Sequence, residues 1–219
     1  MMTNRVQRSS AFAWCLILGG ICFIGRAAAA LAAGPPPSSG IEILAWINDA
    51  RGAMILGNEA LVIGAGLLIA GFYGIQQAFY VLAPMKATAG SAFLFAASVV
   101  CLVLGIVQGR FVYPIHGISL TRPEDAELLA SLYFGGYHLV ALALAVATTF
   151  WSFAMLKEAK WVPLGYLGFA VAAGSVLSSY PDLIGPILVF VLESSLAFWW
   201  IVIGLWLLRS DGAEGDASA

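Results

Sequence analysis

The feature that most constrains this chain is a succession of six long apolar segments. They cover residues 11–33, 52–80, 91–109, 128–156, 161–179 and 186–208. A helix needs about 20 mostly apolar residues to cross the ~30 Å hydrocarbon core of a bilayer, and each segment has about this length or more. A membrane barrel would need shorter segments with alternating apolar and polar residues. The sequence therefore predicts an all-α integral membrane bundle of six transmembrane helices.

The composition agrees with a single membrane domain. Of the 219 residues, 61% are hydrophobic and 10% are charged, whereas about a quarter of the residues of a soluble domain are charged. We expect one transmembrane domain over residues 1–209 and a disordered cytoplasmic tail over residues 210–219. The net charge of -2 offers no basic surface, so nucleic acid is not an expected partner. Cys15, Cys22 and Cys101 lie in apolar runs, as small buried side chains do.

The positive charges of the connecting segments predict the orientation in the membrane. Lysine and arginine are enriched on the cytoplasmic side of membrane proteins. One set of chain ends and loops carries Arg5, Arg8, Lys86, Lys157, Lys160 and Arg209, and the opposite set carries Arg51, Arg110 and Arg122. This bias predicts that both termini lie in the cytoplasm, and we expect a bacterial inner-membrane location. The first segment also resembles a cleavable signal peptide, so its retention is an expectation and its removal stays open.

Caps and small residues predict some of the packing. Ser39-x-x-Glu42 and Thr121-x-x-Glu124 have the pattern of capping boxes, which predicts helices that begin after Ser39 and Thr121. The prolines and glycine of Pro181–Pro186 predict a tight turn between antiparallel fifth and sixth segments. Small residues recur along one face of the second segment, which predicts close helix packing and a central position for this helix. They are Gly57, Gly64, Gly71 and Gly74.

Four ionisable residues lie inside the apolar segments, where they are costly and are candidates for function. Arg26, Glu59 and Glu193 each lie about seven residues from the outer end of their segment, and His138 about ten. At 1.5 Å per residue, all four lie about 10–15 Å below the outer surface. Three polar residues lie at similar or shallower levels and are added to the candidate ligand-binding set: Asn58, Gln108 and Tyr137.

This layer has three interpretations. Arg26 and one carboxylate could form a buried structural ion pair. Alternatively, Arg26 could bind the carboxylate or phosphate of a small molecule between apolar walls, while Glu59, Glu193 and His138 tune charge or relay a proton. A catalytic site is the third. Haem or metal bound through His138 or His116 is less expected, because the two histidines lack the spacing of a ligand pair, and the cofactors remain unknown.

Two segments resemble a known family. Lys160-Trp161-Val162-Pro163-Leu164-Gly165-Tyr166-Leu167-Gly168, with Gly174 after it, resembles the entry to the fifth span in a bacterial six-span family catalogued as domain-of-unknown-function family 4386. Trp199-Trp200-Ile201-Val202-Ile203-Gly204-Leu205-Trp206-Leu207-Leu208-Arg209 is similar to the last span of that family. The resemblance implies a six-span topology. It implies no activity, because no reaction or ligand is assigned to the family.

The expected function is therefore stated at the level of a class. We expect binding, sensing or translocation of a small amphiphilic or anionic molecule in a polar pocket of the outer half. The alternative is an accessory structural subunit of a larger membrane complex, or a homo-oligomer, and an intramembrane enzyme is the third possibility. The lipid bilayer is a partner in each case.

Overall fold

The computed structural model describes the backbone of residues 3–216 and the side chains of residues 10–209. Its long helices are α1 (Thr3–Ala33), α3 (Arg51–Tyr80), α4 (Pro84–Val112), α5 (Pro123–Met155), α6 (Val162–Ser178) and α8 (Pro186–Asp216). The short ones are α2 (Gly40–Asp49), α7 (Pro181–Ile184) and a 3-10 turn, η1 (Ala159–Trp161). Six helices are long and apolar enough to cross a membrane, which confirms the predicted all-α bundle.

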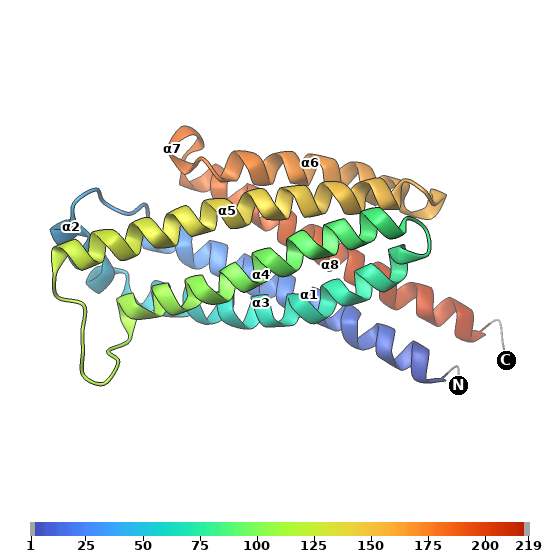
Figure 1. Cartoon of the computed structure of the whole chain (residues 1–219), viewed down its shortest axis with the longest axis horizontal. Coiled ribbons are helices and arrows are strands. Elements are labelled where there is room, and N and C mark those ends of the chain that lie inside the picture. The colour runs from blue at the N-terminus through green and yellow to red at the C-terminus, as the bar shows by residue number, and fades with distance from the viewer. Residues whose placement is uncertain (1–2, 217–219) are drawn as a thin grey trace.

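The six long helices form a closed ring. Neighbours around it are α1, α3, α4, α5, α6 and α8, and α8 packs again on α1. Consecutive helices run antiparallel, so α2, α7 and the α4–α5 loop gather at one end, opposite the two termini (Figure 1). We name the first of these the outer end and the second the inner end. The side of the membrane that each faces remains a prediction.

Of the two predicted capping boxes, the structure contains the one at Ser39 but not the one at Thr121. Ser39 is the N-cap of α2, and its hydroxyl accepts a hydrogen bond from the Glu42 backbone N–H, as predicted. The predicted helix after Thr121 is present and begins at Pro123, but the capping role of Thr121 is wrong, because Arg122 is the N-cap and makes no side-chain cap bond. A proline ring at the first turn fixes φ and needs no N–H partner, so the helix begins there without a capping hydroxyl.

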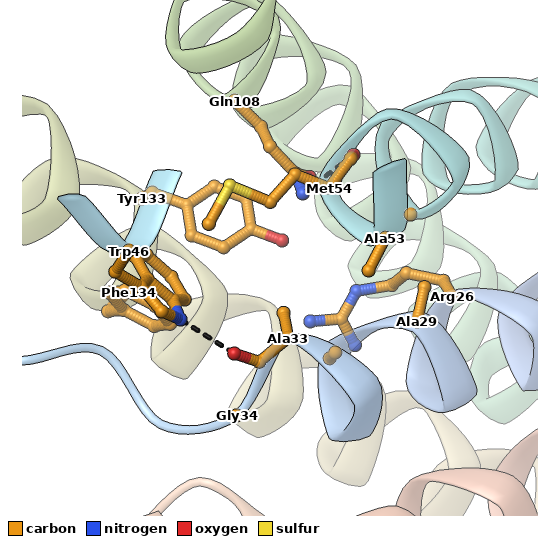
Figure 2. A pocket seen from close by; sticks show the side chains of 12 residues that line it. Arg26, Ala29, Ala33, Gly34, Trp46, Ala53, Met54, Gln108, Tyr133 and Phe134 are labelled. Carbon is orange, nitrogen blue, oxygen red and sulfur yellow. Dashed lines mark hydrogen bonds between the residues drawn. The ribbon is translucent and has the colours of Figure 1, made fainter. Parts of the chain in front are cut away.

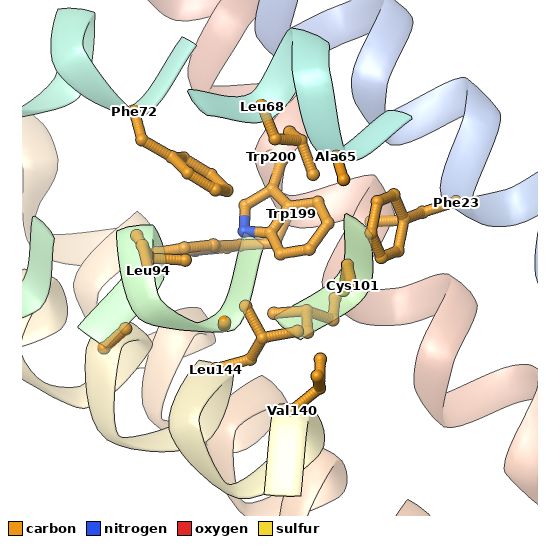
Figure 3. Close-up of a cluster of buried hydrophobic side chains, with 14 of the residues drawn as sticks. Phe23, Ala65, Leu68, Phe72, Leu94, Cys101, Val140, Leu144, Trp199 and Trp200 are labelled. Carbon is orange, nitrogen blue, oxygen red and sulfur yellow. The ribbon is translucent and has the colours of Figure 1, made fainter. Parts of the chain in front are cut away.

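The inner half of the ring is filled by aromatic side chains. Trp199 and Trp200 of α8 lie among side chains from α1, α3, α4 and α5 (Figure 3). The Phe72 ring lies 5.4 Å from the Trp151 ring and 5.6 Å from the Trp200 ring, in edge-to-face geometry. Such pairs contribute beyond the apolar area that they bury. The result is a solid core below the layer of polar residues.

The glycines of α3 form the predicted packing face, and α1 lies against it. A Cβ at Gly64 would lie 3.0 Å from the Cys22 Cβ, and one at Gly71 would lie 2.8 Å from the Leu16 Cγ. The prediction that this helix is central is wrong. It is one member of the ring, and Leu56 and Ile63 are exposed on its outward side.

The C-terminal end of the chain differs in part from the expected disordered tail. The backbone of α8 continues as a helix to Asp216, so the segment after Arg209 is helical for most of its length. Residues 217–219 lie outside the described residues.

Substitution of Gly64 tests this helix contact, with Gly66 as a matched control on the same helix. Gly64→Ala places a methyl group against Phe23 and Cys22, and we expect it to lower the free energy of unfolding by about 1–3 kcal/mol. Nothing lies within 4 Å of a Cβ at Gly66, so Gly66→Ala should be neutral or stabilising by up to about 1 kcal/mol. Thermal unfolding in mild detergent measures both. Equal effects would show that α1 and α3 are not in close contact.

Candidate functional site

One buried arginine connects three helices at the level where the solid core ends. Arg26 of α1 is only 5% exposed. Its Nη1 donates a hydrogen bond to Glu193 Oε2 of α8 at 2.8 Å and another to the Tyr137 hydroxyl of α5. The Arg26 Cζ also lies 3.6 Å from the centroid of the Tyr137 ring. Because α1 and α5 are not neighbours in the ring, these bonds cross its interior.

A large cavity lies on one side of this group. Its volume is about 560 Å³, which is within the usual range of small-molecule sites. It is lined by residues of α1, the linker after it, α2, α5, the end of α6, α7 and α8. The apolar part of its lining includes Phe134, Val189 and Phe190, and the ionisable part comprises Arg26, Glu127, Tyr137, His138, Asp182 and Glu193. The cavity therefore offers both polar partners and apolar walls.

His138 lines this cavity, and a hydrogen bond defines the tautomer of its ring. Its Nδ1 lies 2.9 Å from the Ser179 carbonyl oxygen. A carbonyl oxygen only accepts hydrogen bonds, so Nδ1 carries the proton. In the neutral ring, Nε2 is then left with a lone pair that can accept a hydrogen bond. The Tyr180 ring packs edge to face on the imidazole and fixes its plane.

The linker between α1 and α2 covers the cavity at the outer end. Residues Pro35, Pro36, Pro37 and Ser38 belong to the lining, and proline rings restrict this segment to extended backbone. Both ends of the linker are tied down. Trp46 Nε1 donates to the Ala33 carbonyl at 2.7 Å, and the backbone N–H of Gly40 donates to Glu127 Oε1 at 2.6 Å.

Glu59 does not belong to this group, which corrects the prediction of four ionisable residues in one pocket. It lies on the outward side of α3, where it is exposed and accepts a hydrogen bond from the Tyr113 hydroxyl at 2.8 Å. This bond to the carboxylate raises the pKa of Tyr113, because the phenol must keep its proton to donate. The depth of Glu59 was predicted from its position along the helix, but depth does not say which side of the helix a residue occupies.

Asn58 and Gln108 lie on the other side of Arg26, near a second, smaller cavity. This space of about 60 Å³ is lined by Arg26, Gln108, Tyr133 and Trp46, among others. Figure 2 shows Arg26 and Gln108 reaching it from different helices. Gln108 donates weakly to the Met54 carbonyl at 3.4 Å. Three buried polar atoms here have no protein hydrogen-bond partner: Arg26 Nε, Gln108 Oε1 and Asn58 Oδ1.

The histidines are not arranged as a pair of ligands. His116 lies in the α4–α5 loop, with a φ of 50°, and does not line either cavity. Within the residues that the structure describes, no group of three or more His, Cys, Asp and Glu side chains is placed to hold a metal ion.

Two acidic lining residues, Glu127 and Asp182, were missed by the sequence analysis, as were the linker prolines. A signal for Glu127 exists in the sequence. Glu127, Ser131, Phe134 and His138 recur at intervals of three or four residues and so share one face of α5. No such signal exists for Asp182 or the prolines, because their position depends on how the chain turns outside the helices.

The Arg26–Glu193 pair should be strongly coupled. We expect Glu193→Leu to lower the free energy of unfolding by about 3–5 kcal/mol, because it leaves a buried guanidinium without its counter-charge. The double variant Arg26→Leu, Glu193→Leu should recover most of that loss. Thermal unfolding in detergent of the parent, the single variants Arg26→Leu and Glu193→Leu, and the double variant measures the coupling. Simple addition of the two single effects would contradict it.

The small cavity should contain ordered water. It is large enough for at least one water molecule, and two of its lining residues, Arg26 and Gln108, carry unpaired buried polar atoms. We expect density bridging Arg26 Nε and Gln108 Oε1 in a structure at a resolution that shows water, and its loss in Gln108→Leu. An empty space in the unsubstituted protein would contradict this expectation.

Comparison of the chain with models of known protein families, with curated proteins and with solved structures finds no match.

Proposed function

We propose that this protein binds a small amphiphilic molecule in the 560 Å³ cavity of its outer half. The observation that carries the proposal is the cavity itself, which lies between a buried, hydrogen-bonded polar group and apolar walls. The polar head of the ligand would lie near Arg26, Glu193 and His138. Its apolar body would lie against Phe134, Val189 and Phe190.

The combination of apolar walls with a few polar groups in the lining supports an amphiphile over a fully polar solute. Small-molecule sites typically combine mostly apolar walls with a few placed polar groups that fix orientation. Here the polar groups come from α1, α5 and α8, and most of them are already held by protein hydrogen bonds. A site whose side chains are held before the ligand arrives loses less conformational entropy on binding.

Binding or sensing is favoured over translocation. The aromatic core around Trp199 and Trp200 fills the ring below the cavity, so passage to the inner end would require these packed rings to separate. Under the proposed orientation, with both termini in the cytoplasm of a bacterial cell, the cavity belongs to the periplasmic half of the inner membrane. Membership of the chain in family 4386 likewise remains a proposal, based on the two segments that resemble it.

An accessory structural subunit is the alternative function. The small-residue face of α3 was its main support, but Gly64, Gly71 and Gly74 pack against α1 of the same chain. No particular observation favours this alternative or an intramembrane enzyme over the binding protein.

Filling the cavity tests the proposed function, and α1 offers a matched pair of positions. Ala30 lines the cavity, and Ala28 is exposed on the same helix outside the lining. We expect Ala30→Phe to abolish saturable binding of the uncharged fluorescent amphiphile N-phenyl-1-naphthylamine, because the added ring occupies the space for the ligand. Ala28→Phe should bind as the unsubstituted protein does. Fluorescence titration in nanodiscs, with empty nanodiscs as reference, gives the affinities.

The two variants also separate binding from folding. Both should keep the circular dichroism and melting temperature of the parent within a few degrees. If the parent shows no saturable binding beyond the empty nanodiscs, or if Ala30→Phe binds as well as Ala28→Phe, the cavity is not the binding site.

A further inference from the structure

We infer that the molecule bound in the large cavity is an organic cation, an amine or quaternary ammonium with an apolar body. This inference rests on the proposed function and specifies the charge of its ligand. The sequence alone favoured the opposite charge, because Arg26 was expected to hold an anionic head group. The contacts of Arg26 reverse that expectation.

The positive charge at the floor of the cavity is already matched. Arg26 Nη1 lies 2.8 Å from Glu193 Oε2, and both side chains are largely buried. An anionic ligand would have to displace Glu193 from this pair and leave a carboxylate unpaired, which is costly in a buried site. The second oxygen, Glu193 Oε1, is not used by Arg26 and suits an ammonium group.

The remaining charges of the lining are negative. Glu127 and Asp182 line the cavity near its outer end and are exposed. With Glu193 they make three carboxylates against the single guanidinium of Arg26, when His138 is neutral. An entering cation is therefore attracted from the mouth of the cavity down to its floor, and an anion is repelled along the same path.

The outer end of the bundle as a whole also has a net negative charge. It carries the carboxylates of Glu42, Asp49, Glu59, Glu124, Asp125, Glu127, Asp182 and Glu193 against the guanidinium groups of Arg26, Arg51, Arg110 and Arg122. All these residues lie in the described part of the chain. A surface with twice as many carboxylates as guanidinium groups raises the local concentration of cations.

The uncharged groups of the lining also favour a cationic ligand. The lone pair of His138 Nε2 accepts an N–H from an amine, since Nδ1 is engaged with the Ser179 carbonyl. The rings of Phe134 and Phe190 also line the cavity. The faces of aromatic rings attract cations, and quaternary ammonium groups are commonly bound this way.

A pair of ions with the same shape and opposite charge tests the inference. Tetraphenylphosphonium and tetraphenylborate both carry four phenyl rings, and triphenylphosphine oxide serves as a related uncharged probe. Equilibrium dialysis against protein in zwitterionic nanodiscs, with empty nanodiscs subtracted, gives the dissociation constants. We expect the phosphonium ion to bind at least about tenfold more tightly than the borate ion, because ion–carboxylate and cation–ring attractions add.

The variant Asp182→Asn, with Asp49→Asn as its control, tests whether the phosphonium ion binds in the cavity. Asp182 lines the cavity, whereas Asp49 ends α2 at the same end of the bundle outside the lining. We expect Asp182→Asn to weaken phosphonium binding about two- to fivefold, the size of an exposed ion-pair contribution, and Asp49→Asn to leave it unchanged.

Each result has a separate meaning. Equal binding of all three probes, or tighter binding of the borate ion, would overturn the assignment of charge and leave the proposed function standing. Equal losses in the two aspartate variants would show that phosphonium is held by the outer surface and not by the cavity, which also overturns it. Absence of saturable binding of every probe would contradict the inference and the proposed function together.

Discussion

The ion pair between Arg26 and Glu193 is the constraint on which the rest of this structure depends. A buried guanidinium group at this depth is costly without a counter-charge, because burial removes most of the hydration that would stabilise its charge. Glu193 supplies that charge from α8, and Tyr137 adds a hydrogen bond and a ring face from α5. Three helices are thereby fixed at one level, although two of them are not neighbours in the ring. Both members of the pair line the large cavity, and Arg26 lines the small one as well.

The division of the bundle into a solid inner half and a hollow outer half follows from side-chain size. Below the ion pair, indole and phenyl rings from several helices fill the ring interior. Above it, α1 contributes mainly alanines from Ala27 to Ala33, which leave space beside the larger side chains of Phe134 and Tyr137 in the lining. Three prolines then continue the chain over that space as an extended segment. A cavity of this size thus arises from small residues beside large ones, and from a linker too stiff to collapse into it.

Counting along the sequence predicted how deep a residue lies in the membrane, but not which side of its helix it occupies. Helix length and apolar composition predicted the six helices, and counting residues from helix ends placed Arg26, His138 and Glu193 at one depth. The same counting included Glu59, which lies at a similar depth but on the outward side of α3, one position and about 100° around the helix from the inward-facing Asn58. The glycine face of α3 held a signal for the side of the helix, because Glu59 lies two positions and about 200° around the helix from Gly57, but counting residues from the helix end does not use it. Asp182 could not be placed for a related reason, since its position at the cavity follows from the path of α7, whereas Glu127 shares one face of α5 with His138 and so had a signal in the sequence.

The structural and the functional interpretations of the buried arginine are compatible. Read from the sequence, a structural ion pair and a ligand site were alternatives, because a guanidinium used by one partner was assumed to be lost to the other. In the structure, Arg26 is used structurally, and this use changes the chemistry that remains at the cavity. Pairing cancels the one buried positive charge among the described side chains and leaves the lone pair of His138 and the carboxylates of the mouth as the groups that line the cavity. An arginine inside a membrane protein therefore does not by itself indicate an anionic ligand. Where its charge is already matched, the sign of the ligand is set by the residues around the pair.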